Sequence, residues 1–255
     1  MPAVLRAMVL AGVVAVAMSG SAHAGRGDYG WLYSTEVLPE RSVELQQWVW
    51  EEDNKDGPAH TKETKLWWGP VVGLTDQLEI ALPIELAWST GQDATGATTT
   101  RFTLSDYGIE ARYRFVSQDP VDKPAFAPLL RVGVKRDVTQ RDGVIGEADL
   151  VAAYDFSPDV QAAVDVGFIG EVHTGNHPHD FELRPAVGVS VKVVGDVRFG
   201  AEAFAALDLL DSRYSWAVVG PNMAVTHGRF WLSAAFGIGV YHIDYAPRLI
   251  WGVLF

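Results

Sequence analysis

The sequence predicts an all-β fold, a single antiparallel transmembrane β-barrel of about twelve strands that follows a cleaved N-terminal signal peptide. Three observations support this prediction. Apolar and polar side chains alternate with a period of two along most of the chain after residue 25. Most of the alternating stretches span 9 to 17 residues, well above the roughly 5–6 residues of strands in soluble sheets. Aromatic side chains gather near the ends of these stretches, as they do at the two interfaces of a membrane barrel.

Residues 1–24 have the pattern of a secretory signal peptide. Arg6 supplies positive charge, residues 7–18 are apolar, and Ala22-His23-Ala24 matches a cleavage site of the A-x-A type. The apolar run is too short to cross about 30 Å of hydrocarbon as a helix. We therefore expect cleavage after Ala24 and export of the mature chain across the inner membrane.

The mature chain divides into a short lead-in and the barrel. We expect residues 25–42 to form a periplasmic lead-in and residues 43–255 to form the barrel. The predicted strands are residues 43–51, 61–74, 78–90, 99–115, 124–136, 143–156, 160–172, 179–194, 197–207, 214–226, 229–241 and 247–255.

The connections between the strands alternate in length. Four of them, at residues 75–77, 157–159, 195–196 and 227–228, are tight and rich in the Gly, Asp and Pro that reversals require. The connections on the other side are longer, with 5 to 9 residues each. In outer-membrane barrels the short turns face the periplasm, so an even number of strands leaves both termini there.

The polar faces of the strands carry charges at mid-strand, and exposing these charges to lipid has a high free-energy cost. An Arg or Lys on the lipid side costs about 2–4 kcal/mol at the midplane, whereas a wet lumen accepts it. The predicted lumen-lining residues are Glu110, Arg112, Arg114, Arg131, Lys135, Glu147, Asp149, Asp155, Asp165, Glu182, Arg184, Lys192, Arg198 and Glu202. The alternative is a soluble β protein that exposes these faces to water.

Aromatic residues mark the expected membrane interfaces. Trp88 and Phe181 lie near the long connections. The girdle near the tight turns consists of Phe115, Phe126, Tyr154, Phe156, Phe199, Phe230 and Phe255.

Composition excludes several classes of function. The formal net charge of −12 argues against nucleic-acid binding, which depends on Lys and Arg to neutralise phosphates. The absence of cysteine excludes disulfide scaffolds, thiolate metal sites and iron–sulfur clusters. We expect no cofactor.

The last strand carries a terminal motif. Leu249, Trp251, Val253 and Phe255 alternate on one face, and Phe255 is the last residue. This pattern resembles the carboxy-terminal signature of bacterial outer-membrane proteins, which the barrel-assembly machinery reads. The resemblance implies that these four residues act as an assembly signal.

Two further stretches resemble a known group of proteins. Residues 31–39 (WLYSTEVLP) with 43–46 (VELQ), and residues 73–80 (GLTDQLEI) at the first tight turn, are similar to uncharacterised Gram-negative outer-membrane β-barrels. Some members of that group are labelled as transporters of phenol-degradation pathways. The resemblance implies the fold and an outer-membrane location, while no residue here points to a phenolic substrate.

Two constellations could carry chemistry. The loop at residues 171–180 contains His173, His177 and His179, which are possible ligands for zinc, copper or nickel. The alternative is a solvated surface loop, because the spacing of a metal motif is missing. Ser215 and His242, followed by Asp244, could form a hydrolase site on the lipid face, but no lipase motif surrounds them.

These observations favour a passive channel or small-solute transporter that weakly prefers cations. Twelve strands enclose more room than eight, and no loop exceeds 9 residues, too few to fold in as a plug. The longer connections carry nine acidic residues against three basic ones (Glu52, Asp53, Asp56, Asp93, Asp137, Asp142, Asp208, Asp211 and Asp244 against Lys55, Arg141 and Arg213). The alternatives are a non-conducting structural or binding barrel with an ion-paired lumen and, more remotely, the lipid-face hydrolase. The expected partners are outer-membrane lipid, the barrel-assembly machinery and a small solute.

Overall fold

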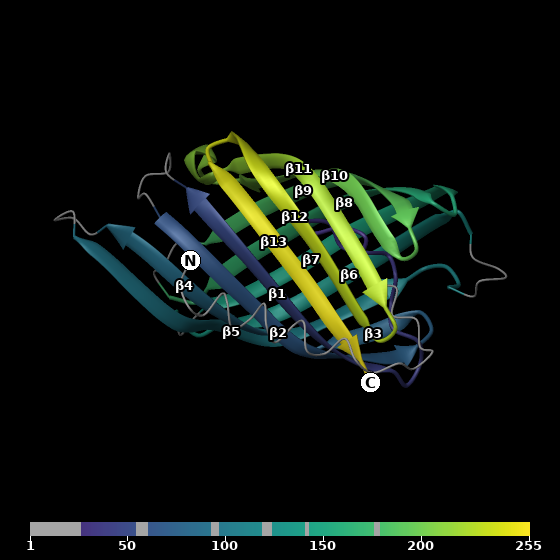
Figure 1. Ribbon diagram of the computed structural model, residues 1–255. Helices are drawn as coiled ribbons and strands as arrows, with labels where there is room; N and C mark the ends of the chain where they lie inside the picture. Colours follow the sequence, from purple (N-terminus) through teal and green to yellow (C-terminus); the bar gives the residue numbers. More distant parts are fainter. Residues whose placement is uncertain (1–26, 55–60, 93–96, 119–123, 141–142, 176–178) are drawn as a thin grey trace.

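The chain folds into one closed antiparallel barrel (Figure 1). The computed structural model describes residues 27–54, 61–92, 97–118, 124–140, 143–175 and 179–255, so the predicted signal peptide lies outside the described residues. The barrel closes because β1 pairs with both β2 and β13. The strands are β1 (Val43–Asn54), β2 (Thr61–Thr75), β3 (Leu78–Ala81), β4 (Ile84–Gln92), β5 (Thr98–Arg114), β6 (Phe126–Asp137), β7 (Gly143–Ser157), β8 (Val160–His173), β9 (Asp180–Val194), β10 (Val197–Asp208), β11 (Trp216–His227), β12 (Phe230–Tyr241) and β13 (Tyr245–Leu254).

The prediction of about twelve strands is confirmed, with one strand interrupted. The predicted strand at residues 78–90 is divided at Leu82 and Pro83 into β3 and β4, and both pieces pair with β2 and β5. Proline has no N–H for the ladder. The backbone N–H of Leu82 donates to the Pro70 carbonyl at 3.1 Å, and that of Gly108 donates to the Pro83 carbonyl at 3.1 Å. The wall therefore stays closed across the break.

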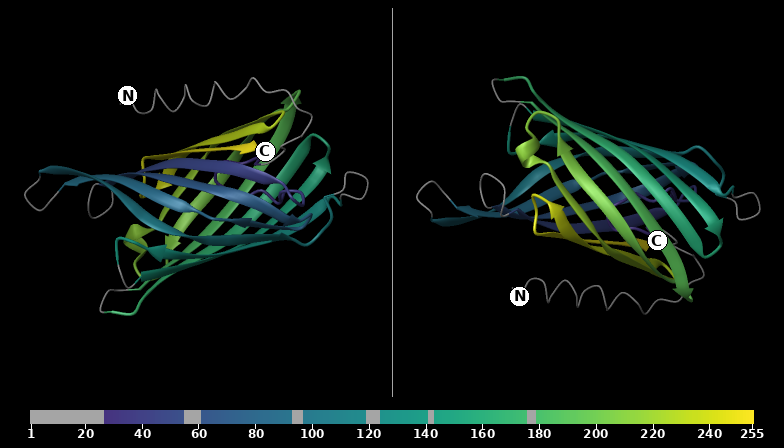
Figure 2. Two further views of the ribbon diagram at one scale, coloured as in Figure 1. Left: turned by 90° about the horizontal axis from the view of Figure 1, so that it is seen from below. Right: turned by 90° about the horizontal axis from the view of Figure 1, so that it is seen from above.

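The tight turns lie at the end of the barrel that holds the C-terminus (Figure 1). Gly195 and Gly228 have φ angles of 54° and 60° there, a conformation that two-residue turns with primed geometry require and that glycine adopts without strain. At the opposite end the β4–β5 hairpin projects well beyond the other strands (Figures 1 and 2). A short 3₁₀ helix, η2 (Ser212–Tyr214), lies between β10 and β11. None of the helical segments described here has the length and apolarity of a membrane span.

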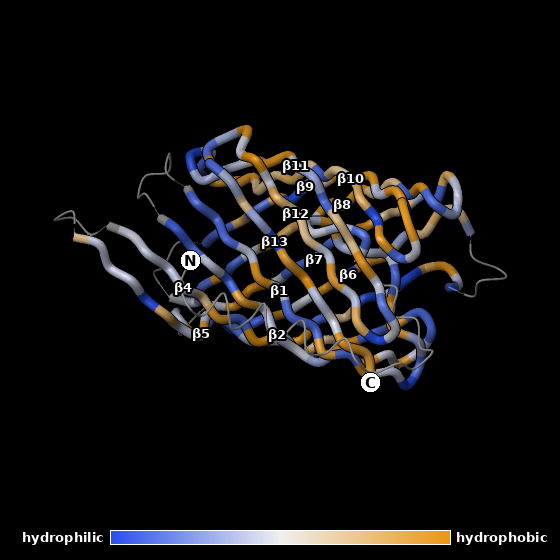
Figure 3. Tube along the Cα trace, viewed as in Figure 1, coloured by the Kyte–Doolittle hydropathy of each residue, from blue (hydrophilic) through white to orange (hydrophobic). Residues whose placement is uncertain are grey.

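The two faces of the wall differ as the periodicity predicts. Hydrophobic and hydrophilic residues alternate along the strands (Figure 3). Leu150 is 57% exposed on the outer face, whereas its neighbour Val151 is fully buried on the inner face. Six of the seven residues of the predicted girdle near the tight turns are exposed, and Phe230 is half-buried. The exposed ones are Phe115, Phe126, Tyr154, Phe156, Phe199 and Phe255.

Residues 27–42, which we call the lumen segment, form neither helix nor strand. They precede β1, and residues 27–38 lie inside the barrel. The sequence predicts a periplasmic lead-in at residues 25–42, and this prediction has to be corrected for residues 27–38, which contact the inner wall. Pro39, Glu40 and Arg41 are exposed, and they lie at the tight-turn end, where the N–H of Arg41 donates to the Gly73 carbonyl at 2.9 Å.

Candidate functional site: the barrel lumen

A carboxylate on β10 binds the lumen segment through three consecutive backbone amides. The N–H groups of Gly30 and Trp31 donate to Glu202 at 2.6 and 2.7 Å, and that of Leu32 donates at 3.2 Å. The Glu202 residue is only 3% exposed. A buried carboxylate needs such donors, since desolvation without hydrogen bonds would be costly. Glu202 is therefore the main polar anchor of the segment.

Further anchors on other strands hold the rest of the lumen segment. Asp165 on β8 accepts from the Tyr33 N–H at 3.2 Å, and Glu79 on β3 accepts from the Leu38 N–H at 2.6 Å. Gln118, just after β5, makes both an accepted and a donated hydrogen bond with the backbone of Val37, at 2.9 and 3.0 Å. The segment thus follows the inner wall from β10 past β8 to β3.

Arginines bind the carbonyl groups of the same segment. Arg114 donates to the Thr35 carbonyl at 2.8 Å, and Arg248 on β13 donates to the Trp31 carbonyl at 3.2 Å. Near the tight-turn end, Arg198 pairs with Asp28 at 3.3 Å. Side chains of the wall, rather than strand pairing, supply these contacts.

Aromatic packing complements the hydrogen bonds. The ring of Trp31 stacks on Phe204 at 4.7 Å and meets Trp216 edge-on at 5.7 Å. The ring of Tyr33 lies 5.3 Å from Trp48. Such aromatic pairs contribute roughly 0.5–1.5 kcal/mol beyond their buried area.

Small residues of the wall and the segment allow this close approach. A Cβ on Gly188 would lie 2.9 Å from ring carbons of Tyr29, and a Cβ on Gly30 would lie 2.5 Å from the Cβ of Ala235. A larger side chain at either position would push the segment away from the wall.

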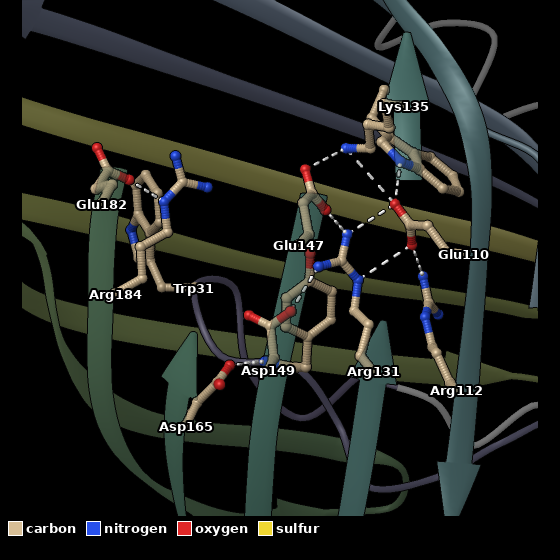
Figure 4. Close-up of polar contacts among 12 residues, drawn as sticks. Trp31, Glu110, Arg112, Arg131, Lys135, Glu147, Asp149, Asp165, Glu182 and Arg184 are labelled. Carbon is tan, nitrogen blue, oxygen red and sulfur yellow. Dashed lines mark hydrogen bonds and ion pairs between the residues drawn. The ribbon is translucent and has the colours of Figure 1, made fainter. Parts of the chain in front are cut away.

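A second feature of the lumen is an ion-pair network across β3 to β7, of which Figure 4 shows the part on β5, β6 and β7. We call it the charge network, and it comprises Glu79, Glu85, Glu110, Arg112, Arg131, Lys135, Glu147 and Asp149. Arg131 is its centre: it pairs with Glu110 at 2.7 Å, with Asp149 at 2.6 Å and with Glu147. Its guanidinium carbon also lies 4.5 Å from the centre of the Tyr33 ring. The network therefore stiffens one side of the lumen and contacts the lumen segment.

Two cavities among the described residues border the lumen segment. The larger one, of about 280 Å3, is bordered by charged residues and by Trp31, Tyr33, Trp48, Trp50 and Trp67. The smaller one, of about 40 Å3, is bordered by Gly27, Tyr29 and Glu36. Tyr33 and Trp48 border both cavities. The lumen segment therefore divides the space, with the larger cavity on the side of the long connections.

The lumen segment is not predicted from the sequence, in which only the loops are candidates for a plug. Alternating aromatic residues at Tyr29, Trp31 and Tyr33 were the available signal, because such side chains are costly to leave in water. Their partners could not be identified from the sequence, since the contacts of the segment with Glu202 join residues 170 to 172 positions apart.

Most of the predicted lumen-lining residues lie on the inner face. Glu110, Arg112, Arg114, Arg131, Lys135, Asp149, Asp165 and Glu202 are buried. Glu147 pairs with Lys135 at 2.7 Å, and Glu182 pairs with Arg184 (Figure 4). Asp155 and Arg198 lie nearer the tight turns, bonded to Gln161 and Ser190 respectively. The Lys192 side chain is 40% exposed and lies 3.9 Å from Asp196 of a tight turn, so it belongs to the rim rather than to the enclosed lumen.

The histidine loop lies at the end of the barrel with the long connections. His177 lies outside the described residues. The backbone N–H of His173 donates to Nδ1 of His179 at 3.2 Å, and Nε2 of His173 lies 3.4 Å from Glu171. Within the described ranges, no group of three or more His, Cys, Asp or Glu side chains is arranged to hold a metal ion.

The lipid-face position predicted for Ser215 is wrong. The residue is only 5% exposed, and its hydroxyl oxygen accepts the N–H of Asp208 at 3.0 Å. Ser215 directly follows the 3₁₀ helix η2, which interrupts the strand expected over residues 214–226 and leaves the Ser215 hydroxyl bonded to the end of β10.

The predicted assembly-signal residues lie on the outer face of β13. Leu249, Trp251 and Val253 are partly exposed, and Phe255 is 70% exposed. The Trp251 ring lies 6.5 Å from that of Phe230 on the neighbouring strand. Their role in assembly stays a prediction.

Sequence comparisons identify no relatives. No protein-family model matches the chain, and no curated protein matches it in sequence.

Comparison with solved structures shows the fold of outer-membrane β-barrels. An outer membrane channel from Pseudomonas putida F1 is similar with a TM-score of 0.63 at 10% identity, covering 87% of this chain and 98% of that one. The translocator domain of the autotransporter NalP from Neisseria meningitidis has a TM-score of 0.51 at 11% identity, with coverage of 98% and 94%. The β domain of the Bordetella autotransporter BrkA has a TM-score of 0.51 at 8% identity, with coverage of 84% and 99%. The general resemblance to outer-membrane barrels is thus confirmed for the fold, while the label of a phenol-degradation transporter is not confirmed.

Proposed function

We propose that this protein is an outer-membrane channel for small solutes and that the lumen segment sets the width of its pore. The observation that carries the proposal is the cavity of about 280 Å3 between the lumen segment and the long connections. Side-chain hydrogen bonds and aromatic packing hold the segment, and no strand ladder locks it in place. A segment held in this way can shift without opening the barrel wall.

The charges around the larger cavity favour cations. Nine acidic and five basic side chains border it, a formal balance of −4. Glu52 of the predicted long connections belongs to this border. Five other charged residues of those connections lie outside the described residues: Asp56, Asp93, Asp142, Lys55 and Arg141. At the outer end Asp211 is paired with Arg213 at 2.5 Å, so this pair adds no net charge to the entrance. An acidic vestibule raises the local concentration of cations, and salt screens this effect over about 8 Å at physiological ionic strength.

Similarity to the channel from Pseudomonas putida F1 gives the proposal further support at the level of fold. Twelve strands also leave room beyond what side chains fill in an eight-stranded barrel.

The test is a planar-bilayer recording of the mature protein across a salt gradient. We expect small, steady conductance and a reversal potential that indicates cation preference in dilute salt and weakens in concentrated salt. Asp180→Asn, at the cavity border, should shift the reversal potential toward anions. Asp211→Asn is the matched control, because Asp211 lies in the η2 connection and is paired with Arg213 at 2.5 Å.

A second candidate is a non-conducting barrel with an ion-paired lumen. The buried charge network and the small volume of the second cavity, about 40 Å3, favour it. A correctly folded barrel that shows no conductance, with or without the lumen segment, would decide for this alternative.

A further inference from the structure

Asp165, an acidic side chain at the border of the larger cavity, has no ionic partner among the described residues. Asp165 on β8 is only 4% exposed. Its Oδ2 accepts the Tyr33 N–H at 3.2 Å, while its Oδ1 is buried without a hydrogen-bond partner. Within the described part of the chain no Lys, Arg or His side chain forms an ion pair with it. Such a carboxyl group lacks the donors that burial requires.

One basic side chain at the same cavity is in the complementary situation. Arg248 on β13 donates through Nη1 to the Trp31 carbonyl, but its Nε is buried without a partner. Its guanidinium lies 5.2, 4.9 and 5.5 Å from the rings of Trp31, Trp48 and Trp50. Aromatic faces attract this cation, but they give its Nε–H group no acceptor.

Each of the other basic side chains at this cavity has a carboxylate partner. Lys65 lies 3.2 Å from Glu63, and Lys135 lies 2.7 Å from Glu147. Arg131 pairs with Asp149 at 2.6 Å, and Arg184 pairs with Glu182. Of the basic residues described at the cavity border, Arg248 is therefore the one without a carboxylate.

The two side chains flank the same stretch of backbone. Asp165 holds the N–H of Tyr33, and Arg248 holds the carbonyl of Trp31, only two residues away. Both border the cavity of about 280 Å3, which is near the lower end of the roughly 300–1,000 Å3 of small-molecule pockets. The cavity therefore offers Asp165, Arg248 and tryptophan rings to a single small molecule.

We propose that Asp165 and Arg248 bind a small zwitterion of the amino-acid type, with its carboxylate on Arg248 and its ammonium on Asp165. A guanidinium matches a carboxylate with two parallel hydrogen bonds, and an ammonium supplies three donors to a carboxylate. The tryptophan rings pack against the apolar part of the molecule. The proposal rests on the proposed function, since the site lies on the path through the lumen.

A ligand with only one charge would satisfy only one of the two side chains, Asp165 or Arg248. A simple anion would meet a cavity border with a balance of −4 and would leave Oδ1 of Asp165 without a donor. A simple cation would leave Nε of Arg248 without an acceptor. A zwitterion has no net charge and satisfies both side chains.

The test measures binding directly on the mature barrel in detergent. The probe is L-leucine, compared with 4-methylpentanoate, which lacks the ammonium, and 3-methylbutylamine, which lacks the carboxylate. Titration calorimetry and tryptophan fluorescence give the affinity without any need for conductance. We expect saturable binding of leucine and affinities at least about tenfold weaker for both analogues, as the loss of one charged hydrogen-bond partner predicts.

Variants assign the two ends of the ligand. Asp165→Asn should abolish the advantage of leucine over 4-methylpentanoate, and Arg248→Met should abolish its advantage over 3-methylbutylamine. Arg248→Lys keeps the positive charge and should retain most of the binding, which separates recognition from loss of packing. Arg213→Met, in the exposed η2 connection, is the control and should bind leucine like the wild type.

The outcomes distinguish this proposal from the channel proposal. Unchanged leucine affinity in both Asp165→Asn and Arg248→Met, or equal binding of a one-charge analogue to the wild type, would overturn the zwitterion site. A conducting barrel that binds no leucine would also overturn the site and leave the channel standing. A barrel that binds leucine as expected but never conducts would refute the channel and support the site.

Discussion

Replacing Glu202 by glutamine should release the lumen segment from the barrel wall. Glu202 accepts three backbone N–H groups, from Gly30, Trp31 and Leu32, at 2.6 to 3.2 Å. Glutamine has nearly the same shape, but its amide presents one oxygen and one NH2 group. The NH2 group would face backbone donors, so at least one N–H would lose its acceptor.

The size of the effect follows from these contacts. A hydrogen bond to a charged group contributes about 1.5–3 kcal/mol. The variant loses the charge and at least one acceptor, so we expect the bound state of the segment to weaken by about 3 kcal/mol. Because about 1.4 kcal/mol corresponds to a factor of ten, the released population should rise on the order of a hundredfold.

Thiol labelling can measure the released population. The chain contains no cysteine, so Thr35→Cys provides a single reporter in the lumen segment, where Thr35 is 4% exposed. We expect a water-soluble maleimide to label this reporter about a hundredfold faster when Glu202→Gln is present, on the magnitude derived above. Glu182→Gln is the control, because Glu182 faces the lumen but pairs with Arg184 rather than with the segment.

Two results would refute this reasoning. An unchanged labelling rate in Glu202→Gln would mean that packing of Trp31 and Tyr33 alone holds the segment. An equal increase in Glu182→Gln would mean that any loss of lumen charge loosens it.

Three further predictions concern the wall. Arg131→Met leaves Glu110, Glu147 and Asp149 without their shared cation, so the free energy of unfolding should fall by about 3–5 kcal/mol; denaturant titration followed by gel mobility of unboiled samples checks this, and a loss below about 1 kcal/mol would contradict it. Val166→Arg, on the outer face of β8, should cost about 2–4 kcal/mol if the residue lies at the midplane, measured by the same titration in lipid vesicles. Deleting Phe255 should lower the yield of assembled barrel and raise periplasmic degradation, as pulse-chase labelling would show; full assembly without Phe255 would remove it from the assembly signal.

The sequence by itself determined the class of fold and the face of most side chains. Side chains of a strand point alternately to its two faces, so the face of one residue determines the face of every other residue of that strand. Thus Glu110, Arg112 and Arg114 share the inner face, as predicted. The alternation alone could not show where Pro83 divides a strand, because a missing N–H interrupts pairing without changing the pattern.

The partners of the lumen ion pairs could not be predicted from the sequence. Periodicity places Arg131 and Glu110 on the same face, but their contact depends on the register between β5 and β6, in which Arg131 lies opposite Arg112. The same holds for Arg248, whose isolation from carboxylates is visible only once all the strands around the cavity are in place. Register is set by pairing along the whole strand and not by any short motif.

The tertiary structure alone decided the path of the lumen segment. Residues 27–42 have no regular backbone pattern, and their partners Glu202, Asp165 and Glu79 come from three separate strands. Tyr29, Trp31 and Tyr33 indicate that the segment needs an apolar environment, yet a lipid interface would satisfy that need as well as a lumen would. The closed barrel resolves the choice, because it places buried carboxylates where the backbone N–H groups of the segment are the donors that satisfy them.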